Sequence, residues 1–191
     1  MSRLAVFAYA SLVSPASASQ TLGRPVEIAA LARLSGWARG WTLARDNAAS
    51  EKTFARADGS LPRYCLGLNL DPDEDAPAPN GALIEVSEAE LERLDLREIR
   101  YTLVEVTDAV AADASFDAVY AYRARPEHHH PTAPAESIIV ATYPATVEAA
   151  FAELGRDQLD LYRATTARPP VEVVDATLIA DAIPEGNPRA W

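Results

Sequence analysis

Glu98 stands where a helix is predicted to end and a strand to begin, a position suited to a proton-transferring carboxylate. The segment Leu94-Asp95-Leu96-Arg97-Glu98 closes the predicted helix, and Tyr101 opens the predicted strand. A carboxylate at the C-terminal end of a helix is unfavourably placed in the field of the helix dipole, an environment that suits a proton acceptor. The competing interpretation is a surface ion pair of Glu98 with Arg97 or Arg100, which these residues alone favour.

The second candidate segment is Phe7-Ala8-Tyr9-Ala10-Ser11-Leu12, in which an apolar strand ends in small residues. Small side chains leave backbone amides accessible, and such amides can form a concave site for an anion or a carbonyl oxygen. An ordinary strand-to-helix turn has the same appearance and is far commoner. Neither segment defines a function when it is considered alone.

The elements that must position these residues are several short strands and a few helices. Ser87 and Glu90 form a predicted capping box, because the Ser87 hydroxyl can accept from the Glu90 amide and the Glu90 carboxylate can reach back. Strands are predicted over residues 4–9, 26–45 (one or two strands, bent at Gly36 and Gly40), 65–70, 82–86, 101–106, 118–122 and 171–179. Helices are predicted from Pro15, from Glu88 towards Glu98, and over 146–154 and 157–162, whereas 46–63 and 127–134 are predicted loops. Strands that outnumber helices and come in runs predict an α+β fold.

The composition argues against fibrous, membrane-spanning and nucleic-acid-binding classes. The 191 residues fit a single domain, 1–191, with an irregular tail from about residue 183. A 49% apolar content supplies a core, yet no run approaches the ~18 apolar residues of a membrane helix. A net charge of −11 opposes binding to nucleic acid. The single cysteine, Cys65, excludes an internal disulfide and the usual thiolate zinc site, and we expect a cytoplasmic protein.

Three further features carry weaker predictions. His128-His129-His130 could bind a metal and serve a metal-dependent hydrolase, but consecutive side chains point in different directions, which favours a solvated loop. Cys65 lies within a strand pattern, which favours a buried thiol over a nucleophile. Trp191 ends the tail, and because burying it would stabilise the chain by about 2–3 kcal/mol, we predict that it docks in a groove of this chain or a partner subunit.

Taken together, the two candidate segments resemble the γ-glutamylcyclotransferase family. Phe7 to Leu12 is similar to that family's Tyr-Gly-Ser-(Leu/Asn) substrate loop. Gly81 to Val86, followed by Leu91 to Tyr101, is similar to its second signature: a Gly-led strand, then a helix ending in Leu-Asp-x-x-Glu, then Tyr and a strand. The separation of about ninety residues between Tyr9 and Glu98 also fits, and the resemblance covers roughly residues 4–124.

The resemblance implies a small mixed β-barrel of about six strands flanked by helices. It also implies a lyase or acyltransferase that needs no cofactor and no metal. In that reaction the α-amine of a γ-glutamyl amide attacks its own γ-carbonyl, giving 5-oxoproline and releasing an amine or amino acid. The implied catalytic residue is Glu98, which would accept and return the proton. The implied substrate-binding residues are Tyr9, Ala10, Ser11, Leu12 and Tyr101.

Ala10 departs from the family pattern, which usually has Gly at this position. A methyl group is costly there if the backbone needs a positive φ, and acceptable if the loop keeps an ordinary conformation. The expected partner is a small γ-glutamyl molecule, bound by a monomer or homodimer, without nucleic acid or membrane. The leaving group stays open among an amino acid, glutathione's dipeptide, an amine and a secondary metabolite. The alternative is a non-catalytic small-molecule binding module on the same fold.

Overall fold

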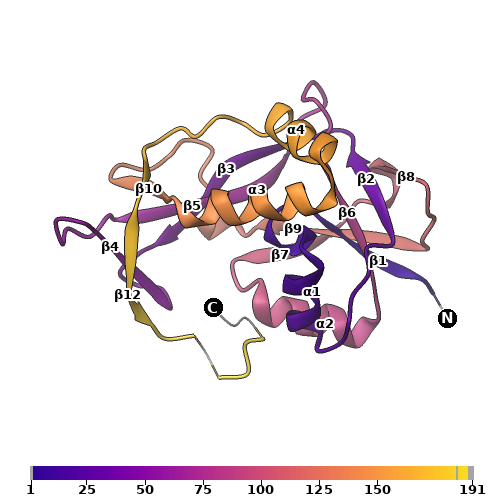
Figure 1. Cartoon of the computed structure of the whole chain (residues 1–191), viewed down its shortest axis with the longest axis horizontal. Coiled ribbons are helices and arrows are strands. Elements are labelled where there is room, and N and C mark those ends of the chain that lie inside the picture. The colour runs from indigo at the N-terminus through magenta and orange to yellow at the C-terminus, as the bar shows by residue number, and fades with distance from the viewer. Residues whose placement is uncertain (1, 184, 189–191) are drawn as a thin grey trace.

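A computed structural model of the chain describes residues 2–183 and 185–188. Among these residues the strands form three sheets, and the largest is a mixed sheet with the order β7-β9-β1-β6-β2-β8 (Figure 1). Its strands are β1 (Leu4–Ala8), β2 (Ala30–Leu34), β6 (Asn80–Val86), β7 (Tyr101–Glu105), β8 (Val110–Ala112) and β9 (Ala118–Ala124). β1 lies in the interior of this sheet, antiparallel to β6 and parallel to β9. The strand that leads into the predicted substrate loop is therefore supported on both edges.

Gly81, the second residue of β6, lies where this strand comes closest to the end of β1. A Cβ atom at Gly81 would lie 2.3 Å from the carbonyl oxygen of Ala8 and 2.7 Å from Cζ of Phe7, distances that real side chains do not show. The absence of a side chain lets β6 approach the end of β1, where Ala8 pairs with Ala82. The end of β1 is thereby fixed directly before Tyr9.

The second sheet has the order β11-β10-β5-β3 and lies beside the first. Its strands are β3 (Trp37–Asp46), β5 (Tyr64–Pro72), β10 (Ser137–Val140) and β11 (Val173–Val174). Side chains join the two sheets: the Ala124 amide of β9 donates to Oδ1 of Asn69 on β5 (2.7 Å), and the Tyr101 hydroxyl of β7 donates to the carbonyl of Leu68 (2.8 Å). These bonds link the curled sheet to β5.

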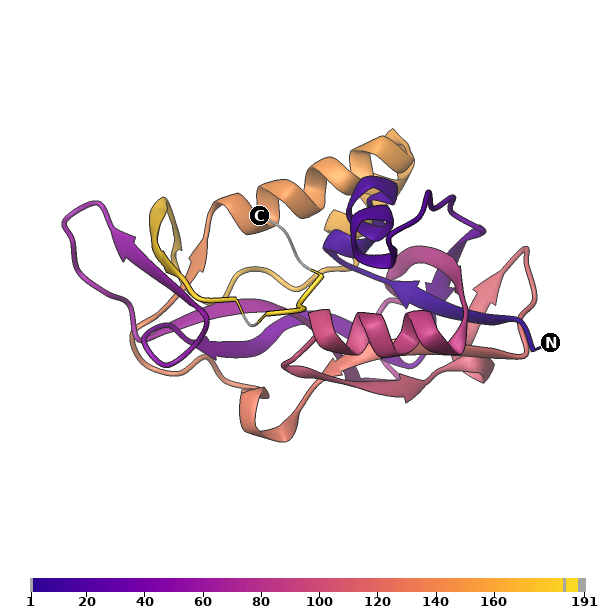
Figure 2. The same cartoon turned by 90° about the horizontal axis from the view of Figure 1, so that it is seen from below.

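The third sheet is a two-stranded ribbon of β4 (Lys52–Arg56) and β12 (Ala176–Asp181). The ribbon lies at the side of the molecule away from the N-terminus (Figures 1 and 2). Its first strand corrects the sequence-based assignment of residues 46–63 to a loop. β4 is five residues long, and its partner lies about 120 residues further along the chain, so local patterning could not reveal it.

Four α-helices of the described chain pack around these sheets: α1 (Pro15–Leu22), α2 (Glu88–Arg97), α3 (Thr142–Leu154) and α4 (Arg156–Ala164). Short 3-10 helices occur at η1 (Ser11–Val13), η2 (Thr107–Ala109) and η3 (Pro126–His128). The predicted capping box of α2 is confirmed, with the Ser87 hydroxyl and the Glu90 carboxylate both engaged. Among the described residues, no helix has the length and apolar character needed to cross a membrane.

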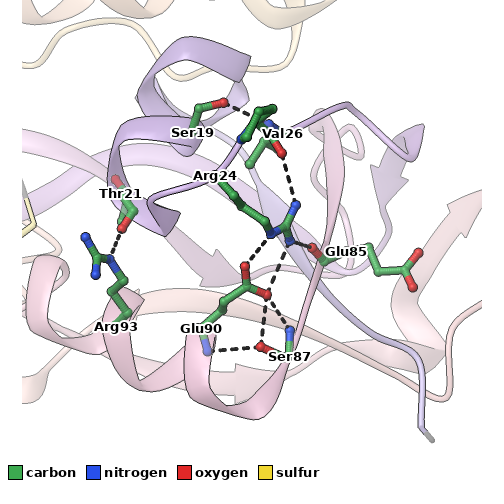
Figure 3. A network of polar contacts seen from close by, with 9 residues as sticks. Ser19, Thr21, Arg24, Val26, Glu85, Ser87, Glu90 and Arg93 are labelled. Atoms are coloured by element: carbon green, nitrogen blue, oxygen red, sulfur yellow. Dashed lines mark hydrogen bonds and ion pairs between the residues drawn. The ribbon is translucent and has the colours of Figure 1, made fainter.

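The helices α1 and α2 are joined to each other by arginine side chains (Figure 3). Arg24, directly after α1, pairs with Glu90 and donates to the carbonyl of Glu85 (2.9 Å). Arg93 of α2 donates to the carbonyl of Thr21 in α1. The helix that follows the predicted substrate loop and the helix that ends at Glu98 therefore form one unit.

The observed architecture confirms the predicted α+β class with a curled, mixed, six-stranded sheet and flanking helices. The short strands β8 and β10 were absent from the sequence-based assignment, as was β4. After β12 the described residues run back towards α2, where the Asn187 side chain donates to the carbonyl of Leu96 (2.6 Å; Figures 1 and 2). The predicted docking of Trp191 concerns a residue outside the described ranges.

Candidate active site

A pocket of about 510 Å³ opens between α1, the end of α2, the sheet of β3 and β5, and the start of α3. Every residue that the sequence analysis named as a site residue lies on its wall: Tyr9, Ala10, Ser11, Leu12, Glu98 and Tyr101. The fold thus brings together two segments that are far apart in the chain.

Glu98 is the residue that caps the C-terminal end of α2. Its amide donates to the carbonyl of Leu94 (2.8 Å), and its own carbonyl accepts from the amide of Tyr101 (2.8 Å), so the backbone on both sides is fixed. The side chain is 11% exposed, and Oε1 lies 3.0 Å from Nε of Arg97. The ion pair considered in the sequence analysis therefore exists with Arg97, but it lies in the pocket wall instead of on the surface.

Arg97 fastens the carboxylate of Glu98 to α1 and the loop before it. Its guanidinium donates to Oγ of Ser17 (3.1 Å), to the carbonyl of Ser17 (3.2 Å) and to the hydroxyl of Thr21. A longer contact reaches Oγ of Ser11 at 3.4 Å. Because Arg97 is 6% exposed, these bonds form in a poorly hydrated environment, where they restrict the position of Glu98 more strongly than a surface pair would.

The hydroxyl groups of Tyr9 and Tyr122 also help to fix the C-terminal end of α2. The Tyr9 hydroxyl donates to the carbonyl of Tyr122 (2.8 Å), and the Tyr122 hydroxyl donates to Oδ1 of Asp95 (2.7 Å). Burial raises the pKa of Tyr9 well above its ordinary value, and burial followed by the Asp95 contact raises the pKa of Tyr122. Both groups therefore stay protonated as donors. The Asp of the Leu-Asp-x-x-Glu segment thus anchors the last turn of α2, the turn that leads to Glu98.

The predicted substrate loop does not use the left-handed conformation that favours glycine. Ala10 has φ −139° and ψ −136°, so a positive φ does not require glycine at this position of the chain. Its carbonyl accepts from the amide of Val13 (3.0 Å), which begins η1. The preceding carbonyl, of Tyr9, accepts from Nη1 of the fully buried Arg39 (3.0 Å). The buried guanidinium of Arg39 therefore holds the backbone at the start of the loop.

Two tyrosine hydroxyls occupy the edge of β5 beside the pocket. The β10 ladder pairs with β5 at Tyr64 and Cys65. Beyond that point, Tyr101 donates to the carbonyl of Leu68 (2.8 Å), and the Tyr143 hydroxyl accepts from the Leu68 amide (3.4 Å). The hydroxyl proton of Tyr101 is thus directed at the backbone of β5, and its side chain lies on the pocket wall.

The part of the pocket near β4 is rich in charge. Arg100 and Glu51 form an ion pair whose side chains are 11% and 8% exposed, and Nη1 of Arg100 lies 2.9 Å from Oε1 of Glu51. Arg45 and Lys52 also line this part. No residue of this group was named as a site residue by the sequence analysis.

Simple spacing could have found two of the missed residues. Arg97 lies three residues after Leu94, and this spacing puts it on the buried face of α2 together with Leu94. Arg45 lies two residues after Leu43 in β3, and both side chains line the pocket because alternate residues of a strand share a face. The pairing of Glu51 with Arg100 had no comparable signal, since it joins residues 49 positions apart.

His129 and His130 of the histidine tract occupy separate environments. Nε2 of His129 lies 2.8 Å from Oδ1 of Asp71, and the ring of His130 lies 6.0 Å from the ring of Tyr64. Within residues 2–183 and 185–188, no three His, Cys, Asp or Glu side chains gather in an arrangement suited to a metal ion.

Cys65 is buried, as its strand pattern predicted. It is 5% exposed, and its Sγ lies 3.4 Å from Oδ1 of Asn47. Burial raises the pKa of the Cys65 thiol, which makes it a poor nucleophile at neutral pH.

Comparison with solved structures assigns the fold. A structure described as a γ-glutamyl cyclotransferase matches with a TM-score of 0.61 and 13% identity, over 90% of this chain and 93% of its own. An uncharacterised human protein matches with a TM-score of 0.62 and 14% identity, over 91% of this chain and 94% of its own. YkqA from Bacillus subtilis matches with a TM-score of 0.55 and 17% identity, over 85% of this chain and 53% of its own. The chain therefore has the γ-glutamyl cyclotransferase fold.

The sequence comparisons gave no match. No protein-family model fits the chain, and no curated protein sequence is similar to it. A reaction can therefore be inferred only from the site residues themselves.

Proposed function

We propose that the protein is a γ-glutamylcyclotransferase-like enzyme, which cyclises a γ-glutamyl amide to 5-oxoproline and releases an amine or amino acid. The observation that carries this proposal is the position of Glu98. Its carboxylate lines the same pocket as the loop of Tyr9 to Leu12, and the ion pair with Arg97 (3.0 Å) holds it there.

The proposed reaction is an intramolecular acyl transfer. The α-amine nitrogen of the glutamyl group attacks the γ-carbonyl carbon, a five-membered ring closes, and the bond from that carbon to the leaving nitrogen breaks. Glu98 accepts the proton that the attacking amine loses and donates it to the leaving nitrogen. One carboxylate thus serves both proton transfers, and no oxidant, reductant or co-substrate is needed.

The other named residues bind and orient the glutamyl group in this proposal. The amides of Ala10, Ser11 and Leu12 donate to it, since the first amides of a 3-10 helix have no acceptor within that helix. Tyr9 shapes the pocket floor, with its hydroxyl committed to the carbonyl of Tyr122. Tyr101 accepts from the substrate through its oxygen, because its proton is donated to Leu68.

The competing function is a binding module that keeps the pocket without turnover. The support for the enzyme comes from the kind of group that is fixed: a buried ion pair, a helix cap and the Asp95 anchor hold a carboxylate, a group that can accept and return a proton.

The test is incubation of the purified chain with a γ-glutamyl dipeptide and a γ-glutamyl alkylamide, followed by measurement of 5-oxoproline. We expect catalytic release of 5-oxoproline from at least one of them. Saturable binding of these compounds without release would establish the binding module and overturn the enzyme proposal.

A further inference from the structure

The pocket wall carries an excess of positive charge in an acidic protein. The chain has a formal net charge of −11. Yet the titratable groups of the wall that are charged at neutral pH include four cations and two anions: Arg45, Lys52, Arg97 and Arg100, against Glu51 and Glu98. A cleft whose sign opposes that of the whole protein attracts ligands of negative charge.

Two of the four cations are already neutralised by carboxylates. Arg97 is paired with Glu98 at 3.0 Å, and Arg100 is paired with Glu51 through two contacts. The Arg97–Glu98 pair balances the proton-transferring end of the pocket. The Arg100–Glu51 pair lies in the same part of the pocket as Arg45 and Lys52, so that three cationic side chains lie there with one carboxylate.

The described contacts of Arg45 are all to neutral groups. Its Nη1 donates to Oγ of Ser50 (2.6 Å) and to the carbonyl of Lys52, and its guanidinium lies 5.4 Å from the centre of the Phe54 ring. Cys65 lies beside it, and burial raises the pKa of that thiol, so it supplies no counter-charge at neutral pH. Burial also lowers the pKa of Arg45, the response of a cation that lacks a direct carboxylate partner.

The guanidinium of Arg45 contacts neutral groups that a carboxylate can compete with. Two hydrogen bonds leave from Nη1, and the Cys65 thiol makes a further side-chain hydrogen bond with the guanidinium. A thiol is a weak hydrogen-bond partner, whereas the guanidinium fork binds a carboxylate with two parallel, charge-assisted hydrogen bonds.

Arg45 lies two residues along the β3–β5 ladder from the pair next to which the Tyr101 hydroxyl is bonded. In the β3–β5 ladder Leu43 pairs with Gly67 and Arg45 pairs with Cys65, and the Tyr101 hydroxyl is bonded beside Gly67, at Leu68. Two residues along a strand span about 7 Å, which is close to one amino-acid residue plus one hydrogen bond.

We propose that Arg45 is a specificity-determining residue, which binds a carboxylate on the leaving group of the substrate. This inference rests on the proposed function. It selects γ-glutamyl amino acids or peptides, whose leaving groups are anionic, and it disfavours γ-glutamyl alkylamides, whose leaving groups carry no negative charge.

The experiment compares kcat/KM for γ-glutamyl-alanine and γ-glutamyl ethylamide in the wild type, Arg45→Gln, Arg45→Lys and Arg63→Gln. Arg63 is the matched control, because its side chain is 55% exposed, pairs with Asp46 and lies outside the pocket wall. Wild type should prefer γ-glutamyl-alanine. Arg45→Gln should lower kcat/KM for γ-glutamyl-alanine by roughly 10- to 100-fold, the effect of one lost charge-assisted contact, and change that for the ethylamide by less than about threefold.

Arg45→Lys should fall between wild type and Arg45→Gln for γ-glutamyl-alanine, since it keeps the charge and loses the fork. The Arg45→Lys variant also tests the proposal if circular dichroism shows that Arg45→Gln does not fold. An equal loss for both substrates, no loss for either, or a wild-type preference for the ethylamide would overturn the proposal.

Failure of the proposed function has a separate signature. If wild type releases no 5-oxoproline from either compound, the enzyme proposal fails, and calorimetric binding of the two compounds then tests Arg45. Tighter binding of γ-glutamyl-alanine that Arg45→Gln abolishes would still support the anion site. Equal or undetectable binding of both compounds would overturn it.

Discussion

The Glu98 end of the pocket rests on a six-stranded sheet and on two joined helices, whereas the Arg45 end adjoins a two-stranded ribbon. β1 has hydrogen-bonded neighbours on both edges, and all of its residues after Leu4 are buried. The ribbon strand β12 is exposed at every position after Ala176. One end of the pocket is therefore built into the core, and the other is built on its periphery.

This difference corresponds to the two tasks that we assign to the pocket. A proton transfer needs a carboxylate held within a fraction of an ångström, which the buried contacts of Arg97 and Asp95 provide. Recognition of a leaving group tolerates more variation, and segments with few buried contacts open at a lower free energy than core strands. The comparison suggests that the chemistry is fixed by the fold and the specificity by the ribbon side.

We expect the largest effect on stability and turnover from replacement of Arg97, at the Glu98 end of the pocket. In Arg97→Met the carboxylate of Glu98 loses its buried partner, and Ser17 and Thr21 lose a shared donor. We expect a loss of about 3–5 kcal/mol of stability, which lowers the Tm by roughly 10 °C, together with a fall in kcat. Thermal melts and turnover measure both. Arg156→Met, whose side chain is 89% exposed, is the control, and an equal Tm for the two variants would contradict this account of the Glu98 end.

The next effect concerns access to the same end. In Ala10→Val the branched side chain enters the wall of the glutamyl site, and we expect kcat/KM to fall by about 100-fold, the usual consequence of displacing a substrate by an ångström. Ala10→Gly is the control. Glycine removes the methyl group from the pocket wall and keeps the backbone amide, so we expect kcat/KM at least equal to that of wild type, with a loss of up to about 1 kcal/mol in stability. Wild-type activity in the valine variant would show that substrate does not bind at this loop.

The third effect sharpens the comparison at the Arg45 end through pH. Burial acts to raise the pKa of Glu51, but the hydrogen bond and charge of Arg100 outweigh it, so the pKa lies below its ordinary value. A carboxyl group of this kind stabilises the fold above its unfolded pKa, near 4.3, and loses that contribution as pH falls through its folded pKa. Glu51→Gln should therefore lower the Tm by several degrees at pH 7, and the difference should shrink below about pH 4. A constant difference between pH 7 and pH 3 would show that the ion pair is not its source.

The smallest effect concerns the segment that runs from the ribbon back to α2. Asn187→Ala removes the hydrogen bond to the carbonyl of Leu96, worth about 1 kcal/mol, and should lower the Tm by about 2–4 °C. If this segment also walls the pocket, KM should rise with little change in kcat, as when uniform binding is lost. Deletion of residues 187–191 should give the same pattern at greater size. Unchanged melts and kinetics in both variants would show that this segment stabilises neither end.

The Glu98 end of the pocket could be predicted from the sequence better than the Arg45 end, for a physical reason. The α2 helix carries a complete local signal, since Ser87 and Glu90 cap it and Leu94 repeats at helical spacing, so Glu98 could be placed from neighbouring residues. Strand β4 forms only in the presence of β12, far along the chain, and its five residues carry no alternation strong enough to predict it. Spacing could place Arg45 on the face of β3 that carries Leu43, but the pairing between β3 and β5, which local sequence does not show, makes this face a pocket wall.

The most direct test of the account is the rate of 5-oxoproline release by Glu98→Gln, compared with wild type and with Glu92→Gln, an exposed position on the same helix. The amide keeps the volume of the side chain and removes the proton acceptor. We predict that Glu98→Gln lowers kcat by at least about 100-fold while substrate still binds, and that Glu92→Gln matches wild type. Near-normal turnover in a folded Glu98→Gln protein would contradict the central claim that this carboxylate transfers the proton.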